Sequence, residues 1–161
     1  MTSNYFEYNK QKTIQALRYH FISRREIKFM MVLVNVFAML SAGLYYFKKI
    51  SPNAFLMSSV LWFFMMIMFW FLLPRIIYAK SPSFKERFKA DITDEHFGLE
   101  SQKGSRSWAW NDLYSWMESP HFFHVYFSKT AFFIIPKEAF EEEDLTKVRG
   151  YFKAHINASK K

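Results

Sequence analysis

The sequence predicts an α+β membrane protein, in which a two-helix transmembrane hairpin is joined to a small antiparallel β-sheet or barrel capped by a C-terminal helix. Two runs without a charged residue, 29–47 and 54–74, predict the hairpin. A helix of about 20 residues rises roughly 30 Å, which matches the hydrocarbon core of a bilayer. After residue 84, short apolar segments alternate with turn residues, a pattern typical of strands.

Composition narrows the classes of function. The 161 residues hold one compact domain beside the hairpin, and there is no Cys, which excludes disulfides and thiolate metal sites. The net charge is +8. In a membrane protein, such a charge is explained first by orientation and by contact with anionic lipid, so we expect no nucleic-acid partner.

The N-terminal region, residues 1–28, predicts a short strand followed by an amphipathic helix. Residues 3–8 are rich in aromatic side chains, as strands often are. From Lys10 onward, Ile14, Leu17 and Phe21 recur at helical spacing. A basic amphipathic helix before a spanning segment can lie along the head groups or pack on the soluble domain, and the sequence leaves both alternatives open.

The hairpin region, residues 29–78, predicts spans at 29–47 and 54–74. Ser51 is a suitable helix cap before Pro52 at the start of the second span. Basic residues are more frequent outside the two spans than in the short connection between them, which places both termini in the cytoplasm. The candidate residues for contact with the membrane surface and anionic lipid are Arg24, Arg25, Lys28, Arg75, Lys80, Lys85, Arg87 and Lys89.

Small and polar residues inside the spans are candidates for helix–helix packing. Small side chains let transmembrane backbones approach closely, and an amide in lipid requires a hydrogen-bond partner. Asn35 is the only amide in either run, so we expect it to face the second helix or another subunit. The complete set of packing candidates is Asn35, Ser41, Gly43, Ser58 and Ser59.

The C-terminal region, residues 84–158, predicts six strands and one helix. The strands are expected at residues 88–93, 96–101, 105–110, 114–119, 122–128 and 131–135. Strands spaced every eight to ten residues favour an antiparallel sheet that bends or closes into a barrel. A final helical stripe runs through Leu145, Val148, Phe152 and His155 or Ile156, after an acidic segment that suits a helix start.

No catalytic or metal-binding constellation stands out. His121 and His124 are three residues apart, which places them on opposite faces of a strand. The cluster of Trp108, Trp110, Tyr114 and Trp116 could stack on nucleic-acid bases or pack in a core or near the membrane, and the scarcity of interleaved basic residues favours core or membrane-proximal packing. We therefore expect a protein that is not an enzyme and that uses no cofactor or metal.

Three segments resemble the YcxB-like family of bacterial integral membrane proteins. They are SWAWNDL at 107–113, ESPHFFHVYF at 118–127 and FIIPKEAF at 133–140. The resemblance implies a bacterial inner-membrane location and a pleckstrin-homology-like domain, a bent seven-strand sheet capped by one helix. It implies no catalytic residues. Six strands follow the hairpin, so residues 3–8 are the candidate for a seventh.

These expectations lead to a binding role. We expect a non-catalytic adaptor, an accessory subunit of a larger membrane complex that binds through its hairpin and its cytoplasmic domain. The expected partners are membrane lipids and either another membrane protein or further copies of the chain. The alternative is a module that senses anionic lipid through the basic residues.

Overall fold

The computed structural model describes residues 1–156, and the chain divides into two compact units. One unit combines Met1–Ala16 with the chain from Ser81 onward, and the other is Leu17–Lys80. The expected domain at 84–158 ends two residues outside the described part of the chain. The class is mixed α+β, as predicted: two long apolar helices, two small antiparallel sheets and a C-terminal helix.

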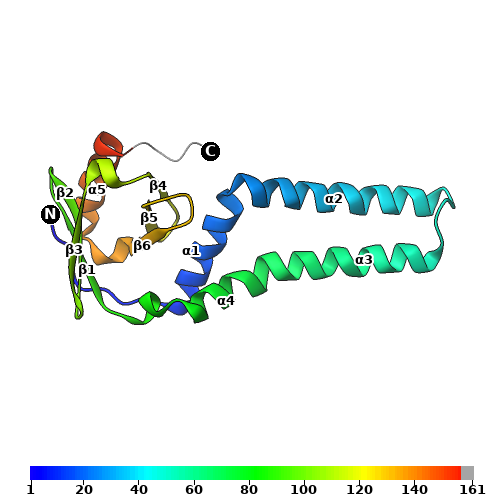
Figure 1. Cartoon of the computed structure of the whole chain (residues 1–161), viewed down its shortest axis with the longest axis horizontal. Coiled ribbons are helices and arrows are strands. Elements are labelled where there is room, and N and C mark those ends of the chain that lie inside the picture. Colours follow the sequence, from blue (N-terminus) through cyan, green and yellow to red (C-terminus); the bar gives the residue numbers. More distant parts are fainter. Residues whose placement is uncertain (157–161) are drawn as a thin grey trace. The chain divides into compact units, whose positions relative to one another are not determined.

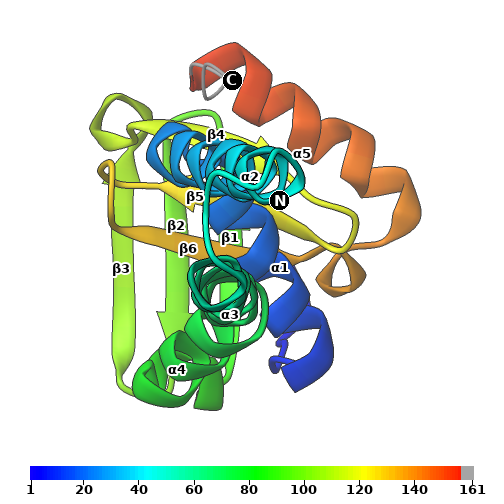
Figure 2. The ribbon, with the colours of Figure 1, turned by 90° about the vertical axis from the view of Figure 1, so that its right-hand side faces the viewer.

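The first unit is built on two separate three-stranded sheets (Figure 1). The first sheet has the order β1 (Phe88–Ile92), β2 (His96–Ser101), β3 (Gly104–Ala109), and the second has the order β4 (Ser115–Glu118), β5 (Phe122–Tyr126), β6 (Phe132–Pro136). Both are antiparallel throughout. In Figure 2 the strands of one sheet run crosswise to those of the other.

The expectation of one continuous sheet or barrel was wrong. A 3-10 turn at Trp110–Asp112 follows β3, and β4 then pairs with β5 instead of returning to β3. At the break, the Trp110 side chain is buried and its indole nitrogen donates to the carbonyls of Thr93 and Asp94, 17 and 16 residues earlier in the chain, at 3.1 Å. These bonds fix the turn against the β1–β2 connection.

The N-terminal segment lies beside β1. Two isolated antiparallel bridges pair Thr2 with Asp91 and Phe6 with Phe88, so the segment is not a continuous strand. The Phe6 and Phe88 amides each donate to the other's carbonyl. Phe6 is buried in the core, and the buried Tyr8 hydroxyl donates to the carbonyl of Ile134 in the second sheet at 2.8 Å. Residues before the hairpin thus complete a core formed by residues after it.

The helix α5 (Glu142–His155) joins the two sheets, and short 3-10 turns at Pro82–Lys85 and Lys137–Ala139 precede β1 and α5. Val148 and Phe152 are fully buried, as the helical stripe predicted. The Phe152 ring contacts aromatic rings from the first sheet, the 3-10 turn and the second sheet: Phe97, Trp110, Trp116 and Phe123. Acidic side chains fill the first turn of α5, where the helix dipole favours negative charge.

The second unit contains two helices that are long and apolar enough to cross a membrane, α2 (Arg25–Tyr46) and a composite helix over Pro52–Lys80. The composite helix consists of α3 (Pro52–Ile67), a π-helical turn (Met68–Leu72) and α4 (Leu73–Lys80). The Ser51 hydroxyl accepts from the Ala54 amide at 3.3 Å, which caps α3. The two helices run antiparallel (Figure 1). Both begin before the predicted runs, and the composite helix continues past residue 74.

Helix α1 (Lys10–Ser23) buries a different stripe from the predicted one. Its buried residues are Thr13, Ala16, Leu17 and His20. Only Leu17 belongs to the expected stripe, since Ile14 and Phe21 are half-buried. Thr13 tolerates burial because its hydroxyl donates to the carbonyl of Asn9 at 2.8 Å. Ala16 packs in the core cluster of the first unit.

Candidate functional site

The two apolar helices carry a polar contact at the middle of their length. Asn35 of α2 faces α3, where its carbonyl oxygen accepts from the indole nitrogen of Trp62 at 3.3 Å. Its amide nitrogen donates to the carbonyl of Met31 on its own helix at 2.7 Å. Asn35 therefore has a partner on the second helix, one of the two arrangements that the sequence favoured.

A second polar contact lies closer to the connecting turn. The hydroxyls of Ser41 and Ser58 are 2.5 Å apart, and Ser41 is the single buried residue of α2. Ser59 donates to the carbonyl of Phe55 one turn earlier. A Cβ added to Gly43 would meet nothing within 4 Å, so no close approach requires a glycine at this position. Small residues thus bring the two helices together at Ser41 and Ser58.

An open groove of about 360 Å³ runs between these contacts. Its α2 side presents Asn35, Ala38 and Ala42, and its α3 side presents Ser59 and Trp62 among aromatic residues. The groove is mainly apolar, with the amide and hydroxyls as its polar points. It contains no acid, Lys, Arg or His, which makes it a surface for packing and hydrogen bonding rather than for proton transfer.

Sequence reasoning missed the π-helical turn at Met68–Leu72 and its partner. The Nε atom of Arg18 donates to the carbonyl of Trp70 inside this turn at 2.9 Å. The Arg18 guanidinium also lies over the rings of Trp70 and Phe71, at 5.6 and 5.4 Å from their centres. A π-turn disturbs the regular ladder of backbone bonds, and Arg18 supplies a donor there. The apolar periodicity of this run gives no signal of the turn.

The basic residues expected at the membrane surface divide between the units. Arg24, Arg25 and Lys28 lie at the start of α2, and Arg75 and Lys80 lie within α4 instead of beyond the helix as expected. The remaining three precede or lie in β1, in the other unit: Lys85, Arg87 and Lys89. Of these, Arg87 is paired with Glu7 and Lys89 lies over the Tyr5 ring.

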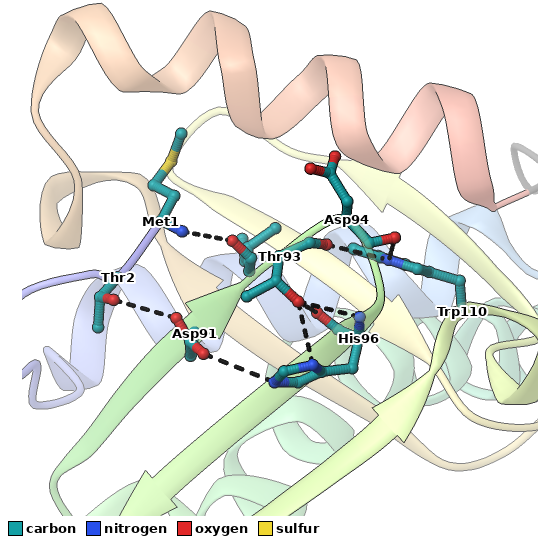
Figure 3. Close-up of polar contacts among 8 residues, drawn as sticks. Met1, Thr2, Asp91, Thr93, Asp94, His96 and Trp110 are labelled. Atoms are coloured by element: carbon teal, nitrogen blue, oxygen red, sulfur yellow. Dashed lines mark hydrogen bonds and ion pairs between the residues drawn. The ribbon is translucent and has the colours of Figure 1, made fainter.

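A Thr–His–Asp arrangement lies at the β1–β2 connection (Figure 3). The His96 ring contacts the Thr93 hydroxyl at 3.0 Å and the Asp91 carboxylate at 3.6 Å. The Thr93 hydroxyl also bonds the backbone of His96, accepting from its amide and donating to its carbonyl. These bonds close the turn. The Thr2 hydroxyl donates to the other Asp91 oxygen at 3.0 Å, so the arrangement also stabilises the contact of the N-terminal segment with β1.

Two further histidines are buried and held in structural roles. His124 of β5 is fully buried, and its Nε2 atom lies 2.9 Å from the Ser119 hydroxyl. His20 of α1 is also buried, and burial, with a smaller effect from the charge of Arg24, lowers its pKa to about 4. Its imidazole is therefore neutral at physiological pH.

A charged cluster of the first unit surrounds Glu118 of β4. Arg149 of α5 holds both carboxylate oxygens, at 3.0–3.1 Å, and Lys137 contacts the same carboxylate at 2.6 Å. Both cations also lie near the face of the Phe123 ring. Partial burial raises the pKa of Glu118, but the hydrogen bonds from Arg149 and Lys137 outweigh it and the net pKa is lowered. The cluster ties α5 to the second sheet.

We expect Glu118→Gln to lower the free energy of unfolding by about 1.5 kcal/mol at pH 7, because hydrogen bonds to charged groups are worth more than neutral ones. Because the pKa of Glu118 is lowered, this contribution is present in full above the ordinary value of 4.5 and is lost progressively as the pH falls from 4.5 through the lowered value. Denaturant unfolding of the full chain in detergent at pH 7 and pH 4 measures both effects.

The control for this prediction is Glu138→Gln, since Glu138 is 55% exposed and pairs only with Lys12 among the described residues. Exposed pairs contribute little, so we expect a change below about 0.5 kcal/mol. Equal losses for the two variants, or a loss for Glu118→Gln that persists unchanged at pH 4, would contradict the structural role of the cluster.

Within residues 1–156, no three His, Cys, Asp or Glu side chains gather in a way that could hold a metal ion. The aromatic residues singled out in the sequence separate into two groups. Trp110 and Trp116 are buried in the core, whereas Tyr114 is 54% exposed. Tyr114 is thus an accessible aromatic side chain on the first unit.

Residues 92–151 match the family model described as YcxB-like protein. The match covers β2 to β6 and most of α5, and it confirms the resemblance that the tryptophan-rich turn and the IIPK segment indicated. No curated protein matches the chain. No solved structure matches it either.

Proposed function

We propose, with the match of residues 92–151 to YcxB-like proteins as the premise, that the chain is a non-catalytic integral membrane protein. In this proposal α2 and the composite helix Pro52–Lys80 span a bacterial inner membrane, and the β-sheet unit is a cytoplasmic binding domain. The protein acts as an adaptor or accessory subunit that holds this domain at the membrane for a protein partner.

The observation that carries the proposal is the exposure of the two apolar helices. In the most apolar stretch of helix Arg25–Tyr46, the rest of the chain buries 6% of the residues. In the most apolar stretch of helix Pro52–Lys80, it buries 0%. A helix that is apolar all round is stable only in a protein core or a bilayer. Lipid or a membrane partner must therefore cover surfaces that the chain leaves open.

The β-sheet unit supports a pleckstrin-homology-like domain as the binding part. Two antiparallel sheets cross one another in Figure 2, the N-terminal segment adds to the edge of the first, and α5 contacts both. The charged and histidine clusters of this unit hold strands, turns and α5 in place. Binding through an exposed surface fits this unit better than catalysis does.

Charge supports an orientation with both termini in the cytoplasm. Arg24, Arg25 and Lys28 flank the start of α2, and Arg75 and Lys80 lie in the last helical segment, against Lys48 and Lys49 in the turn. Cytoplasmic flanks carry the excess of Lys and Arg in membrane proteins. The turn then lies outside the cytoplasm.

Because the chain has no cysteine, single-cysteine labelling tests this orientation cleanly. In spheroplasts, an impermeant maleimide should label Asn53→Cys near the turn, and should label Ser105→Cys of β3 only after the membrane is permeabilised. The protein should also stay in the membrane fraction during alkaline carbonate extraction. The opposite labelling pattern, or release by carbonate, would contradict the proposal.

The adaptor role is tested at Tyr114, because exposed aromatic residues are frequent anchors of protein interfaces. A photo-reactive amino acid at Tyr114 should cross-link one defined protein in native membranes, and that protein should co-purify in fixed stoichiometry in mild detergent. The matched site is Ser105, which is also exposed. Equal cross-linking at both sites, or no stoichiometric partner, would count against the adaptor role.

Contact with anionic lipid is the second candidate, and the position of the basic residues favours it. In an antiparallel hairpin the start of α2 and the end of α4 lie at the same end, which gathers five basic residues there. Each contributes on the order of 1 kcal/mol near an anionic surface. Phosphatidylglycerol should then raise the melting temperature of the full chain in detergent at low salt, and the increase should vanish at high salt.

A further inference from the structure

The groove between α2 and α3 leaves part of one amide without a partner. An asparagine side chain offers two N–H donors and two acceptor lone pairs. Asn35 uses one donor on Met31 and one lone pair on Trp62. Within residues 1–156, the second donor and the second lone pair have no partner.

Leaving this donor and this lone pair of Asn35 without partners is costly in lipid, because no water is present to form hydrogen bonds with them. A hydrocarbon chain lying in the groove would fill the space and leave the amide unsatisfied. A second asparagine amide presents one donor and one acceptor, so two such groups related by a two-fold axis satisfy each other in a pair of hydrogen bonds. The unused capacity of Asn35 is thus self-complementary.

The residues beside Asn35 allow this approach. Ala38 and Ala42 are three and seven residues further along α2, so they lie on the same face as the amide and line the same groove. Side chains as small as alanine let a second helix come close to the backbone. Met39, Phe55 and Phe63 also line the groove, whereas Leu33, Phe37 and Leu40 are exposed and do not line it.

We propose that the groove is the interface for a second copy of the chain, and that two copies meet with Asn35 against Asn35 inside the membrane. This inference rests on the proposed membrane insertion and names the first partner of the hairpin. It gives the groove a symmetric occupant.

Cysteine cross-linking in native membranes tests the interface, since the natural chain contributes no thiol. Ala38→Cys, in the groove, should give a cross-linked dimer with a short bis-maleimide. Leu40→Cys, which is outside the groove and 61% exposed, should give little. Equal yields at the two positions, no dimer from Ala38→Cys, or cross-linking of Ala38→Cys to a different protein would each overturn the inference.

The role of the amide is tested by a matched pair of substitutions. Asn35→Leu keeps the approximate volume and removes the hydrogen bonds, so the dissociation constant of the dimer in bilayers, measured by energy transfer between labelled copies, should rise roughly tenfold. Phe37→Leu, on a residue that does not line the groove, should leave it unchanged. An unchanged constant for Asn35→Leu would overturn the amide pairing.

The two proposals fail in different ways. If carbonate extraction and labelling support membrane insertion while Ala38→Cys forms no dimer, the second copy is excluded and the membrane proposal stands. If carbonate releases the protein, the membrane proposal fails and the inference fails with it.

Discussion

Replacing Phe152 with alanine is expected to lower the free energy of unfolding of the β-sheet unit by about 3–5 kcal/mol, the usual cost of removing a large buried ring. The Phe152 side chain has 0% exposure and contacts rings from both sheets. The cavity would open where α5 joins the sheets. A loss of this size is a large fraction of the stability of a small domain, which is typically 5–15 kcal/mol.

Hydrogen exchange on the full chain in detergent measures this effect unit by unit. Amides of α5, β2 and β5 should lose protection together in Phe152→Ala, whereas amides of α2 and α3 should keep theirs. Phe152→Leu should cost less because it leaves a smaller cavity. The neighbouring exposed residue provides the control, and Lys153→Ala should change protection little. Similar losses in Lys153→Ala would show that α5 does not hold the sheets together through Phe152.

Local patterns were enough to predict most elements of the fold. Strand positions follow from period-two alternation and from turn residues, which act within a few residues, and all six strands occur close to their expected places. The α5 stripe through Val148 and Phe152 follows from helical periodicity. The two apolar helices follow from length and lack of charge.

Features that depend on distant partners could not be predicted. The division into two sheets results from the bonds of Trp110 to the β1–β2 connection, 16 and 17 residues earlier in the chain. The buried face of α1 includes the polar residues Thr13 and His20, which a search for apolar periodicity does not find. In the hairpin, Asn35 was found because an amide is rare in such a run, but nothing local points to the indole of Trp62 as its partner.

The hairpin interrupts the chain of the β-sheet unit. The hairpin is inserted between residues 1–16 and the strands, and the N-terminal segment then pairs with β1. The hairpin is therefore connected to the β-sheet unit at both of its ends.

Replacing Phe6 with alanine tests whether the N-terminal segment holds the β-sheet unit together. We expect the substitution to lower the free energy of unfolding by about 3–4 kcal/mol. Phe6 is 5% exposed, packs edge-on against Tyr8, and pairs with Phe88 through backbone bonds in both directions. Losing the ring removes the main apolar anchor of a segment that has only two isolated bridges. Deleting residues 1–9 should cost more, because the bond that the Ala90 amide donates to the Ser3 hydroxyl and the bond that the Tyr8 hydroxyl donates to the Ile134 carbonyl are then lost as well.

The adjacent residue is a matched control, because Tyr5 is 56% exposed and its hydroxyl bonds only the exposed Glu100 among the described residues. Tyr5→Ala should therefore change stability by less than about 1 kcal/mol. Hydrogen exchange of the β1 amides is the decisive measurement, since protection there should fall in Phe6→Ala and persist in Tyr5→Ala. Unchanged β1 protection after deletion of residues 1–9 would show that the strands and α5 fold without the N-terminal segment, and the hairpin would then be tied to the domain on one side only.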